Sequence, residues 1–253
     1  MRLTLVRHAT LLLETGGRRL IVDPMLDPPA ARAPVRGTPQ ERPNPLVSLP
    51  FSAEEAVAGV EAVMLTHTHV DHLDAAGVEA LPRAAPVFCQ PEDMVDLAPL
   101  GFADLRPVPA GGTLEWQGLR ISRTGGRHGR EEPMVQGMGP VSGFVVEAPG
   151  EPTVYVAGDT VWCEEVATAI ETHRPAWIVV NAGGARMLQG GTITMEAADV
   201  AAVARAAPQA RIVAVHMEAI NHCLERRADL ARALEAEGLA GRVDIPADGG
   251  SLA

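Results

Sequence analysis

The segment from Thr66 to Asp74 concentrates side chains that bind metal ions. It reads Thr-His-Thr-His-Val-Asp-His-Leu-Asp and carries His67, His69, Asp71 and His72. The chain has only 8 histidines in 253 residues, so this pattern would arise by chance with a probability of roughly 0.0004. Neutral imidazoles and carboxylates are ligands for Zn²⁺ and related divalent ions. The segment therefore predicts metal ligation, and a solvated histidine-rich loop is the disfavoured alternative.

The position of this segment also favours a metal site. An apolar strand, Ala62–Leu65, comes directly before it, so His67 and His69 follow the carboxyl end of a strand, where α/β sheets expose their sites. Residues 67 and 69 can point to one side, while Asp71 and His72, which we expect to begin a helix, point to another. One short segment can therefore serve two neighbouring metal ions.

Three later polar residues follow apolar runs in a similar way. His128 lies in Thr-Gly-Gly-Arg-His-Gly, Asp159 in Val-Ala-Gly-Asp-Thr, and His216 in Ile-Val-Ala-Val-His. The glycines around His128 leave room for the backbone to approach a metal, and Gly158 lets the chain turn so that Asp159 projects from a strand end. Taken singly, His128 and His216 would more often be ordinary polar residues than ligands.

His-x-His-x-Asp-His after a strand, followed by these three residues, resembles the signature of the metallo-β-lactamase superfamily, and the match spans nearly the whole chain. The opening, Ala9–Leu13 followed by Leu20-Ile-Val-Asp-Pro24, resembles the branch that includes L-ascorbate-6-phosphate lactonase and other metal-dependent hydrolases. The resemblance implies an α/β fold, an αββα four-layer sandwich in which two packed mixed β-sheets are flanked by helices.

The same resemblance implies a division of the ligands between two metal sites. Site one would consist of His67, His69 and His128, and site two of Asp71, His72 and His216, with Asp159 bridging both ions. The expected ions are Zn²⁺, with Mn²⁺ or iron as alternatives. Two such ions lower the pKa of a bridging water and generate hydroxide, which would cleave a small-molecule lactone, ester, amide or phosphoester. Asp159 would position this nucleophile, and Asp71 is a second catalytic candidate.

The segment His-Met-Glu-Ala-Ile-Asn-His-Cys offers two histidines, His216 and His222. His216 directly follows a strand and is assigned to the metal. His222, which we expect in the first turn of a helix, is assigned to substrate binding or proton transfer, and a structural role for it is equally open. Glu218 and Asn221 are weaker candidates in the same segment.

Several other polar residues have weaker assignments. His8 and His173 have no partners in the sequence, and we expect both to be structural or exposed. Asp23 and Asp74 are candidates for acceptors that orient ligating imidazoles. The turn Asn181-Ala-Gly-Gly184 would either hold a substrate oxygen through backbone N–H groups or be an ordinary turn.

Short apolar runs alternate with alanine-rich stretches, which predicts strands alternating with helices. The expected strands are 3–6, 10–13, 20–22, 61–66, 87–89, 105–108, 113–116, 119–124, 141–147, 153–157, 176–181 and 211–215. The expected helices are 52–58, 71–81, 91–98, 164–173, 194–207 and 219–237. The first of these helices begins with a capping box formed by Ser52 and Glu55.

Both halves of the chain run from antiparallel strands into βα units, so we expect one domain over residues 1–253. The proline-rich segment 24–50 is longer than the connections usual in compact domains. We interpret it as a rim loop beside the site, and a passive surface loop is the alternative.

Composition limits the partners of the protein. The net charge is −11, from 21 arginines, no lysine and 32 acidic residues, which disfavours binding to nucleic acid. No stretch approaches the roughly 18 apolar residues that span a bilayer, and charged residues interrupt the N-terminal apolar run, unlike a secretory signal. Three widely spaced cysteines fit a reduced, cytoplasmic compartment. We expect a small-molecule substrate, and a homo-oligomer is open.

Three rival functions remain beside hydrolysis. An iron-dependent oxidoreductase or dioxygenase on the same fold would need fewer ligands than the chain provides. A nuclease acting on RNA phosphodiesters conflicts with the net charge of −11. A non-catalytic metal sensor would not need the full ligand set. No nucleophile elbow, Walker loop or dinucleotide-binding motif is present.

Overall fold

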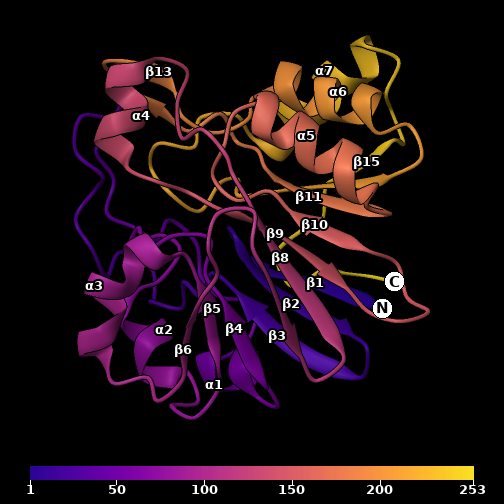
Figure 1. The fold of residues 1–253 in the computed structure, drawn as a ribbon. Helices are drawn as coiled ribbons and strands as arrows, with labels where there is room; N and C mark the ends of the chain where they lie inside the picture. The colour runs from indigo at the N-terminus through magenta and orange to yellow at the C-terminus, as the bar shows by residue number, and fades with distance from the viewer.

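The computed structural model describes residues 1–253 and contains two seven-stranded sheets (Figure 1). In the first sheet the strand order is β16–β1–β2–β3–β4–β5–β6. Strands β16, β1, β2 and β3 pair antiparallel, and β3 to β6 pair parallel, so the sheet is mixed. The bounds are β1 (Arg2–Arg7), β2 (Thr10–Thr15), β3 (Arg18–Val22), β4 (Ala62–Met64), β5 (Val87–Cys89), β6 (Leu105–Pro107) and β16 (Ser251–Leu252).

The second sheet has the order β15–β14–β11–β10–β9–β8–β7 and is also mixed. Its β7 to β10 pair antiparallel, and β10, β11, β14 and β15 pair parallel. The bounds are β7 (Thr113–Trp116), β8 (Leu119–Thr124), β9 (Gly143–Glu147), β10 (Val154–Val156), β11 (Trp177–Asn181), β14 (Arg211–Val215) and β15 (Val243–Asp244). A separate small hairpin joins β12 (Arg186–Met187) and β13 (Gly191–Thr192).

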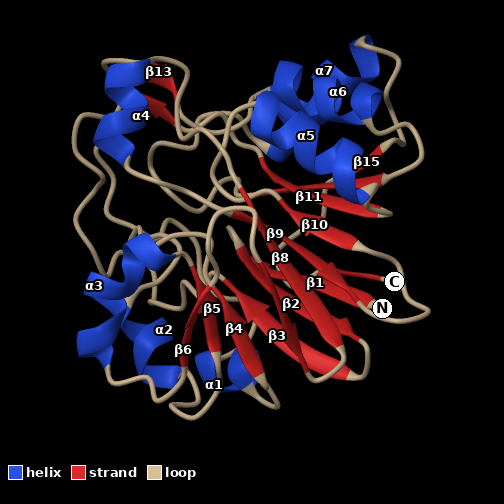
Figure 2. Cartoon of the chain, in the orientation of Figure 1, coloured by secondary structure: helices blue, strands red, loops and turns tan.

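Helices cover the outer faces of both sheets (Figure 2). The first sheet is covered by α1 (Ala53–Val57), α2 (Ala75–Ala80) and α3 (Met94–Leu97), the last flanked by the 3₁₀ turns Pro91–Asp93 and Ala98–Leu100. The second is covered by α5 (Glu164–His173), α6 (Ala197–Ala206) and α7 (Arg227–Ala236). A further helix, α4 (Glu132–Met138), lies beside the β12–β13 hairpin. The predicted αββα sandwich is confirmed.

Alternation along the strands explains why the sequence contains unbroken apolar runs. Leu11 and Leu13 of β2 join a cluster of 22 buried residues between the two sheets, while Leu12 faces the helices of the first sheet. In β10, Val154 and Val156 likewise face the other sheet, and Tyr155 faces the helical layer. A strand buried on both faces is apolar at every position.

Local side-chain bonds decide where the helices begin. The capping box of Ser52 and Glu55 at α1 is confirmed. The expected helix 71–81 is too long, because α2 begins only after Asp74, whose side chain accepts a hydrogen bond from the backbone N–H of Gly77 at 2.8 Å. Asp71 and His72 therefore lie in a loop and not in a helix.

Two later helices also begin later than expected. The prediction of a helix over 219–237 is wrong at its start, since α7 begins at Arg227 and residues 216–226 form a loop in which Glu218 has a left-handed φ of 67°. Helix α6 is capped by Glu196 rather than Thr194, whose hydroxyl instead accepts from the backbone N–H of Ala185 at 3.0 Å.

The proline-rich segment 24–50 contains no helix and no regular strand, only an isolated bridge between Arg32 and Asn44. The buried guanidinium of Arg7 holds it by donating to the backbone carbonyl oxygens of residues 25, 27 and 47, each at 3.0 Å. The side chain of Arg7, at the end of β1, thus fixes a loop that has no secondary structure of its own. None of the helices is long and apolar enough to cross a membrane.

Candidate metal centre

Loops that follow five strands meet at one end of the sandwich and bring the candidate ligands together. These loops follow β1, β4, β8, β10 and β14. The carboxyl ends of parallel strands meet at one edge of a sheet, so residues remote in the chain become neighbours there. The loops carry His8, His67, His69, Asp71, His72, His128, Asp159 and His216.

The first group consists of His67, His69 and His128, whose ligand atoms lie within 4.8 Å of one another. His67 Nε2 is 2.9 Å from His69 Nδ1. The outward-facing Nδ1 of His128 donates to the carbonyl oxygen of Ile193 at 2.8 Å, which leaves its Nε2 as the nitrogen directed inward. Burial lowers the pKa of His128 to about 4, so this imidazole is neutral and able to act as a ligand.

The second group consists of Asp71, His72 and His216, and the structure adds His8 to it. His72 Nδ1 lies 2.8 Å from Asp23 Oδ2. This contact fulfils the role expected of Asp23 as an acceptor that orients an imidazole. The equivalent nitrogen of His216 lies 3.5 Å from the sulfur of Cys223.

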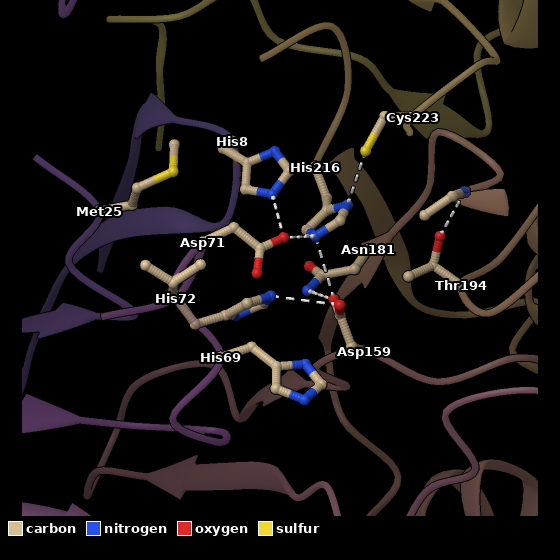
Figure 3. Close-up of polar contacts among 12 residues, drawn as sticks. His8, Met25, His69, Asp71, His72, Asp159, Asn181, Thr194, His216 and Cys223 are labelled. Atoms are coloured by element: carbon tan, nitrogen blue, oxygen red, sulfur yellow. Dashed lines mark hydrogen bonds and ion pairs between the residues drawn. The ribbon is translucent and has the colours of Figure 1, made fainter. Parts of the chain in front are cut away.

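Asp159 lies between the two groups (Figure 3). Its Oδ2 is 3.2 Å from His72 Nε2 and 3.6 Å from His128 Nε2. Its Oδ1 is 3.2 Å from His216 Nε2 and accepts a hydrogen bond from Asn181 Nδ2 at 2.7 Å. A carboxylate in this position can contact ions in both groups. The side chain of Asn181 thus binds Asp159, a contact that the sequence did not predict.

Gly158 is required for this placement. Its φ is 70°, and a Cβ atom there would lie 2.4 Å from the backbone oxygen of Ser142. Only glycine adopts this conformation without a clash. The expectation that Gly158 lets Asp159 project from the end of β10 agrees with this geometry.

The electrostatics of the cluster fit a cation. Burial lowers the pKa of His72, but the charges of Asp159 and Asp23 outweigh it and raise that pKa to about 10. Burial raises the pKa of Asp159, but the neighbouring imidazoles hold it well below its usual value. Opposite charges therefore lie together among buried side chains, which is costly unless each charge is compensated.

Unpartnered nitrogens test whether a metal fits this site. The Nε2 atoms of His72 and His216 are buried and make no hydrogen bond, although both face Asp159. A buried polar atom without a partner costs about 1–3 kcal/mol. A divalent ion held by these lone pairs would compensate both atoms, so the side chains present fit a metal.

A small pocket opens onto the cluster. Its volume is about 270 Å³, and five of its ten lining residues are hydrophobic. No arginine lines it. The lining residues are Val35, His69, Val70, Asp71, His128, Met138, Asp159, Met187, Ile193 and His222. Val35 comes from the proline-rich segment, so that segment forms part of the rim.

The structure decides between the alternatives for His8 and overturns one expectation. His8, expected to be structural or exposed, is fully buried and lies in the second group. Its position directly after the first strand is the signal that could have identified it. Asp74 orients no imidazole; it caps α2 and accepts from the backbone N–H groups of Leu26 and Asp27. His173 lies on α5, outside the cluster.

His222 lines the pocket, but it belongs to neither ligand group. It lies in a loop rather than in the first turn of a helix. Burial lowers its pKa, so its imidazole is neutral, and its Nδ1 has no hydrogen-bond partner. Of the weaker candidates beside it, Glu218 pairs with Arg227 and Asn221 binds the proline-rich segment.

Comparisons with known proteins agree with this fold and cluster. The model of the beta-lactamase superfamily domain matches residues 18–217. The UPF0173 protein YddR of Bacillus subtilis (strain 168) is 37% identical over 253 residues, which cover 99% of each chain.

Two solved structures are similar over their whole length. One is a possible metal-dependent hydrolase from Veillonella parvula DSM 2008, with a TM-score of 0.95 and 32% identity, covering 100% of this chain and 98% of that one. The other is the isothiocyanate hydrolase from Delia radicum gut bacteria, with a TM-score of 0.93 and 36% identity, covering 100% of this chain and 99% of that one. With a family model matching most of its length and a His/Asp cluster able to hold metal, this chain belongs to the beta-lactamase superfamily and is a metal-dependent hydrolase.

Proposed function

We propose that this protein hydrolyses a small, uncharged substrate with the help of two divalent ions, Zn²⁺ in the first instance. His67, His69 and His128 would hold one ion, and Asp71, His72 and His216 the other, with Asp159 between them. Support comes from the convergence of these side chains into two groups that meet at Asp159.

The observation that carries the choice of substrate is the pocket. Half of its lining is apolar, its volume is about 270 Å³, and it contains no arginine to bind a phosphate. Phosphate recognition in proteins relies on arginine, lysine or helix N-termini. Among the bonds open to such an enzyme, this lining favours lactones, esters, amides and related neutral electrophiles over phosphoesters and RNA.

The similar isothiocyanate hydrolase suggests one specific neutral electrophile. Hydrolysis of an isothiocyanate adds the oxygen of water to the carbon that lies between nitrogen and sulfur. The bond between this carbon and the nitrogen breaks. The nitrogen gains both protons of the water, and the products are an amine and carbonyl sulfide. A short linear group of this kind with an apolar substituent suits a pocket of about 270 Å³.

Two bound ions would supply Lewis acidity and a water of lowered pKa. The side chains of the protein transfer the proton and balance the charge. His222, neutral and at the pocket wall, takes the proton that the attacking water loses and returns it to the leaving atom. Asp71 and Asp159 keep their carboxylates ionised beside the imidazoles and balance the positive charge of the site.

Metal analysis tests the ion-binding part of the proposal. We expect about two equivalents of zinc per chain in the wild type and fewer in Asp159→Ala, because Asp159 lies between both groups. His173→Ala, which changes a histidine outside the cluster, should bind as the wild type does. A single tightly held iron in the wild type would instead support the iron-dependent oxidoreductase.

A substrate panel tests the reaction. Isothiocyanates, lactones, amides and phosphodiesters are incubated with the enzyme before and after treatment with a chelator. We expect turnover of isothiocyanates or other neutral substrates that the chelator abolishes and zinc restores. Turnover confined to phosphodiesters would refute the assignment based on the pocket. The variant His222→Ala should lower kcat about 10²–10⁴-fold while keeping its metal content, as expected for loss of a proton-transfer group.

The unpaired thiols Cys89, Cys163 and Cys223 complete the proposal by favouring a cytoplasmic enzyme. Activity that follows the cytoplasmic fraction of the source cells would agree with this, and activity in a secreted fraction would not.

A further inference from the structure

His8 occupies a strained position at the centre of the molecule. It lies in the turn between β1 and β2 with a φ of 60°, and its side chain is fully buried. Non-glycine residues seldom adopt this left-handed conformation, and it persists only where the surrounding contacts hold it. The contacts that hold His8 in this conformation therefore indicate its role.

The shortest of those contacts are made with two candidate ligands, Asp71 and His216 (Figure 3), and the ring centroid of a third, His72, is 6.1 Å away. His8 Nε2 lies 3.4 Å from Asp71 Oδ2, in hydrogen-bonding geometry. The His8 ring lies against the His216 ring, with centroids 3.6 Å apart and an interplanar angle of 36°. The backbone oxygen of His8 accepts from the N–H of His216 at 2.8 Å, which joins the end of β1 to the end of β14.

Almost every candidate ligand has one supporting partner outside the group. Such partners fix the direction of a ligand and are worth 10–100-fold in metal affinity or activity. The pairs are His67 with Thr66, His72 with Asp23, His128 with the oxygen of Ile193, His216 with Cys223, and Asp159 with Asn181. The carboxylate of Asp71 makes a single hydrogen bond, and His8 is its partner.

We propose that His8 is a positioning residue that fixes the carboxylate of Asp71 through Nε2–H and supports the ring of His216, and is not itself a ligand. This inference rests on the proposed two-ion centre. If Nε2 of His8 bound an ion, it would carry no proton for Asp71, and the only hydrogen bond of that carboxylate would be lost. His8 Nδ1 is buried without a hydrogen-bond partner, so Nε2 is the ring nitrogen that has an acceptor, the carboxylate of Asp71.

Two substitutions separate a positioning role from a ligand role. The amide nitrogen of glutamine reaches about as far as His Nε2 and donates a hydrogen bond, but it is a poor ligand for zinc. Alanine removes both functions. Both variants keep a Cβ atom at the same φ, so the backbone strain is equal in the two. His173→Ala is the matched control, since it removes a histidine outside the cluster.

The measurement is zinc affinity by competition with a chelator. We expect His8→Ala to weaken binding of the second zinc about 10–100-fold, His8→Gln to remain within about threefold of the wild type, and the first zinc to be unaffected. Wild-type affinity in His8→Ala would overturn the proposal, and equal losses in both variants would identify His8 as a ligand. Thermal melting of the metal-free variants checks that each folds.

A measurement without metal separates this inference from the proposed function. Nitrogen NMR of the histidine rings should find a proton on Nε2 of His8, with a signal that shifts in Asp71→Asn. Protonation at Nδ1, or no response to Asp71→Asn, would overturn the His8 inference by itself. A wild type that binds only one zinc would refute the two-ion proposal whatever the state of His8.

Discussion

At the scale of single residues, the directions of the His72 and His128 imidazoles are set by the atom bound to their outer nitrogen. His72 Nδ1 faces Asp23 and His128 Nδ1 faces a backbone oxygen, so their Nε2 atoms are directed toward Asp159. A partner on one ring nitrogen fixes the tautomer and leaves the other nitrogen free as a ligand. Changes to these outer partners should therefore alter metal binding without removing a ligand.

We predict that Asp23→Asn lowers metal affinity about 10–100-fold. One Asp23 oxygen accepts from the backbone N–H of Thr66, and the other accepts from its hydroxyl and from His72. Asparagine keeps only one acceptor oxygen, while it tolerates the φ of 45° at this position. Zinc affinity by chelator competition measures the effect.

Asp74→Asn is the control for this prediction. Asp74 is equally buried but binds backbone N–H groups of α2 and the proline-rich segment. The substitution Asp74→Asn should lower the free energy of unfolding and leave zinc affinity unchanged. Equal losses of affinity in the two variants would contradict the assignment of Asp23.

A second residue-scale prediction concerns pH. Burial raises the pKa of Asp93 to about 6, above its unfolded value near 3.8. Because the folded pKa is the higher one, folding favours the protonated carboxyl, and its contribution to stability is lost as the pH rises from about 4 to 6. Asp93→Asn cannot ionise and keeps the acceptor for Gln90. Asp93→Asn should therefore be more stable than the wild type above pH 6, by about 1–3 kcal/mol.

Urea unfolding at pH 5 and pH 7.5 checks this prediction. The gain from Asp93→Asn should be larger at pH 7.5 and shrink at pH 5. A gain that is independent of pH, or that grows on acidification, would contradict the assigned direction.

At the scale of elements, the pocket depends on a segment that has no secondary structure. Segment 24–50 reaches the rim because Asn221, next to His222, binds it at several points. The side-chain oxygen of Asn221 accepts from Val35 N at 3.1 Å and from Asn44 Nδ2 at 2.7 Å, and its amide donates to Thr38 Oγ1 at 2.7 Å. One carboxamide thus connects the loop after β14 to the rim.

We predict that Asn221→Ala releases the rim. Val35 then leaves the pocket wall, so KM should rise about tenfold, which corresponds to about 1.4 kcal/mol of binding, with a smaller change in kcat. Trypsin should cleave after the exposed Arg36 faster than in the wild type. Thr38→Val, which removes one of these hydrogen bonds, should have a smaller effect on both measurements. Unchanged cleavage in Asn221→Ala would show that Arg7 alone holds the segment.

At the scale of the whole molecule, the metal centre draws on both sheets. The 67–72 segment and His8 follow strands of the first sheet, while His128, Asp159 and His216 follow strands of the second. The sheets share a cluster of 22 buried residues between them. We infer that residues 1–253 form one domain in which the sheets and the metal centre are stable only together.

We therefore predict that calorimetry shows a single unfolding transition. Binding of metal should raise the midpoint temperature of this whole transition. Free zinc at about 100 times its dissociation constant should add about 2.7 kcal/mol to the free energy of unfolding, because only the folded protein offers the complete site. Removal with a chelator should reverse the shift. Two transitions, of which zinc moves only one, would contradict a single cooperative unit.

Elements whose signals are local could be predicted to the residue. The predicted ranges 87–89, 113–116, 119–124 and 211–215 are those of β5, β7, β8 and β14, and 164–173 is that of α5. The start of α2 could not be predicted in this way, since it depends on the hydrogen bond that the side chain of Asp74 accepts from the backbone N–H of Gly77. The small β12–β13 hairpin and α4 were not predicted from the sequence, because each is short and contains glycine.

The spacing of His67, His69, Asp71 and His72 after an apolar strand is local, so the sequence by itself determined the metal chemistry and, through the family resemblance, the fold. The roles of His8 and Asn221 depend on contacts with residues 63 or more positions away, such as the 3.4 Å contact to Asp71. No periodicity or motif encodes a contact of that kind, because it exists only when folding has brought loops that are remote in the chain together. Asp23 and the rim segment 24–50 could be expected from the sequence, whereas only the tertiary structure showed that His8, Asn181 and Cys223 contact candidate ligands and that Asn221 holds the rim.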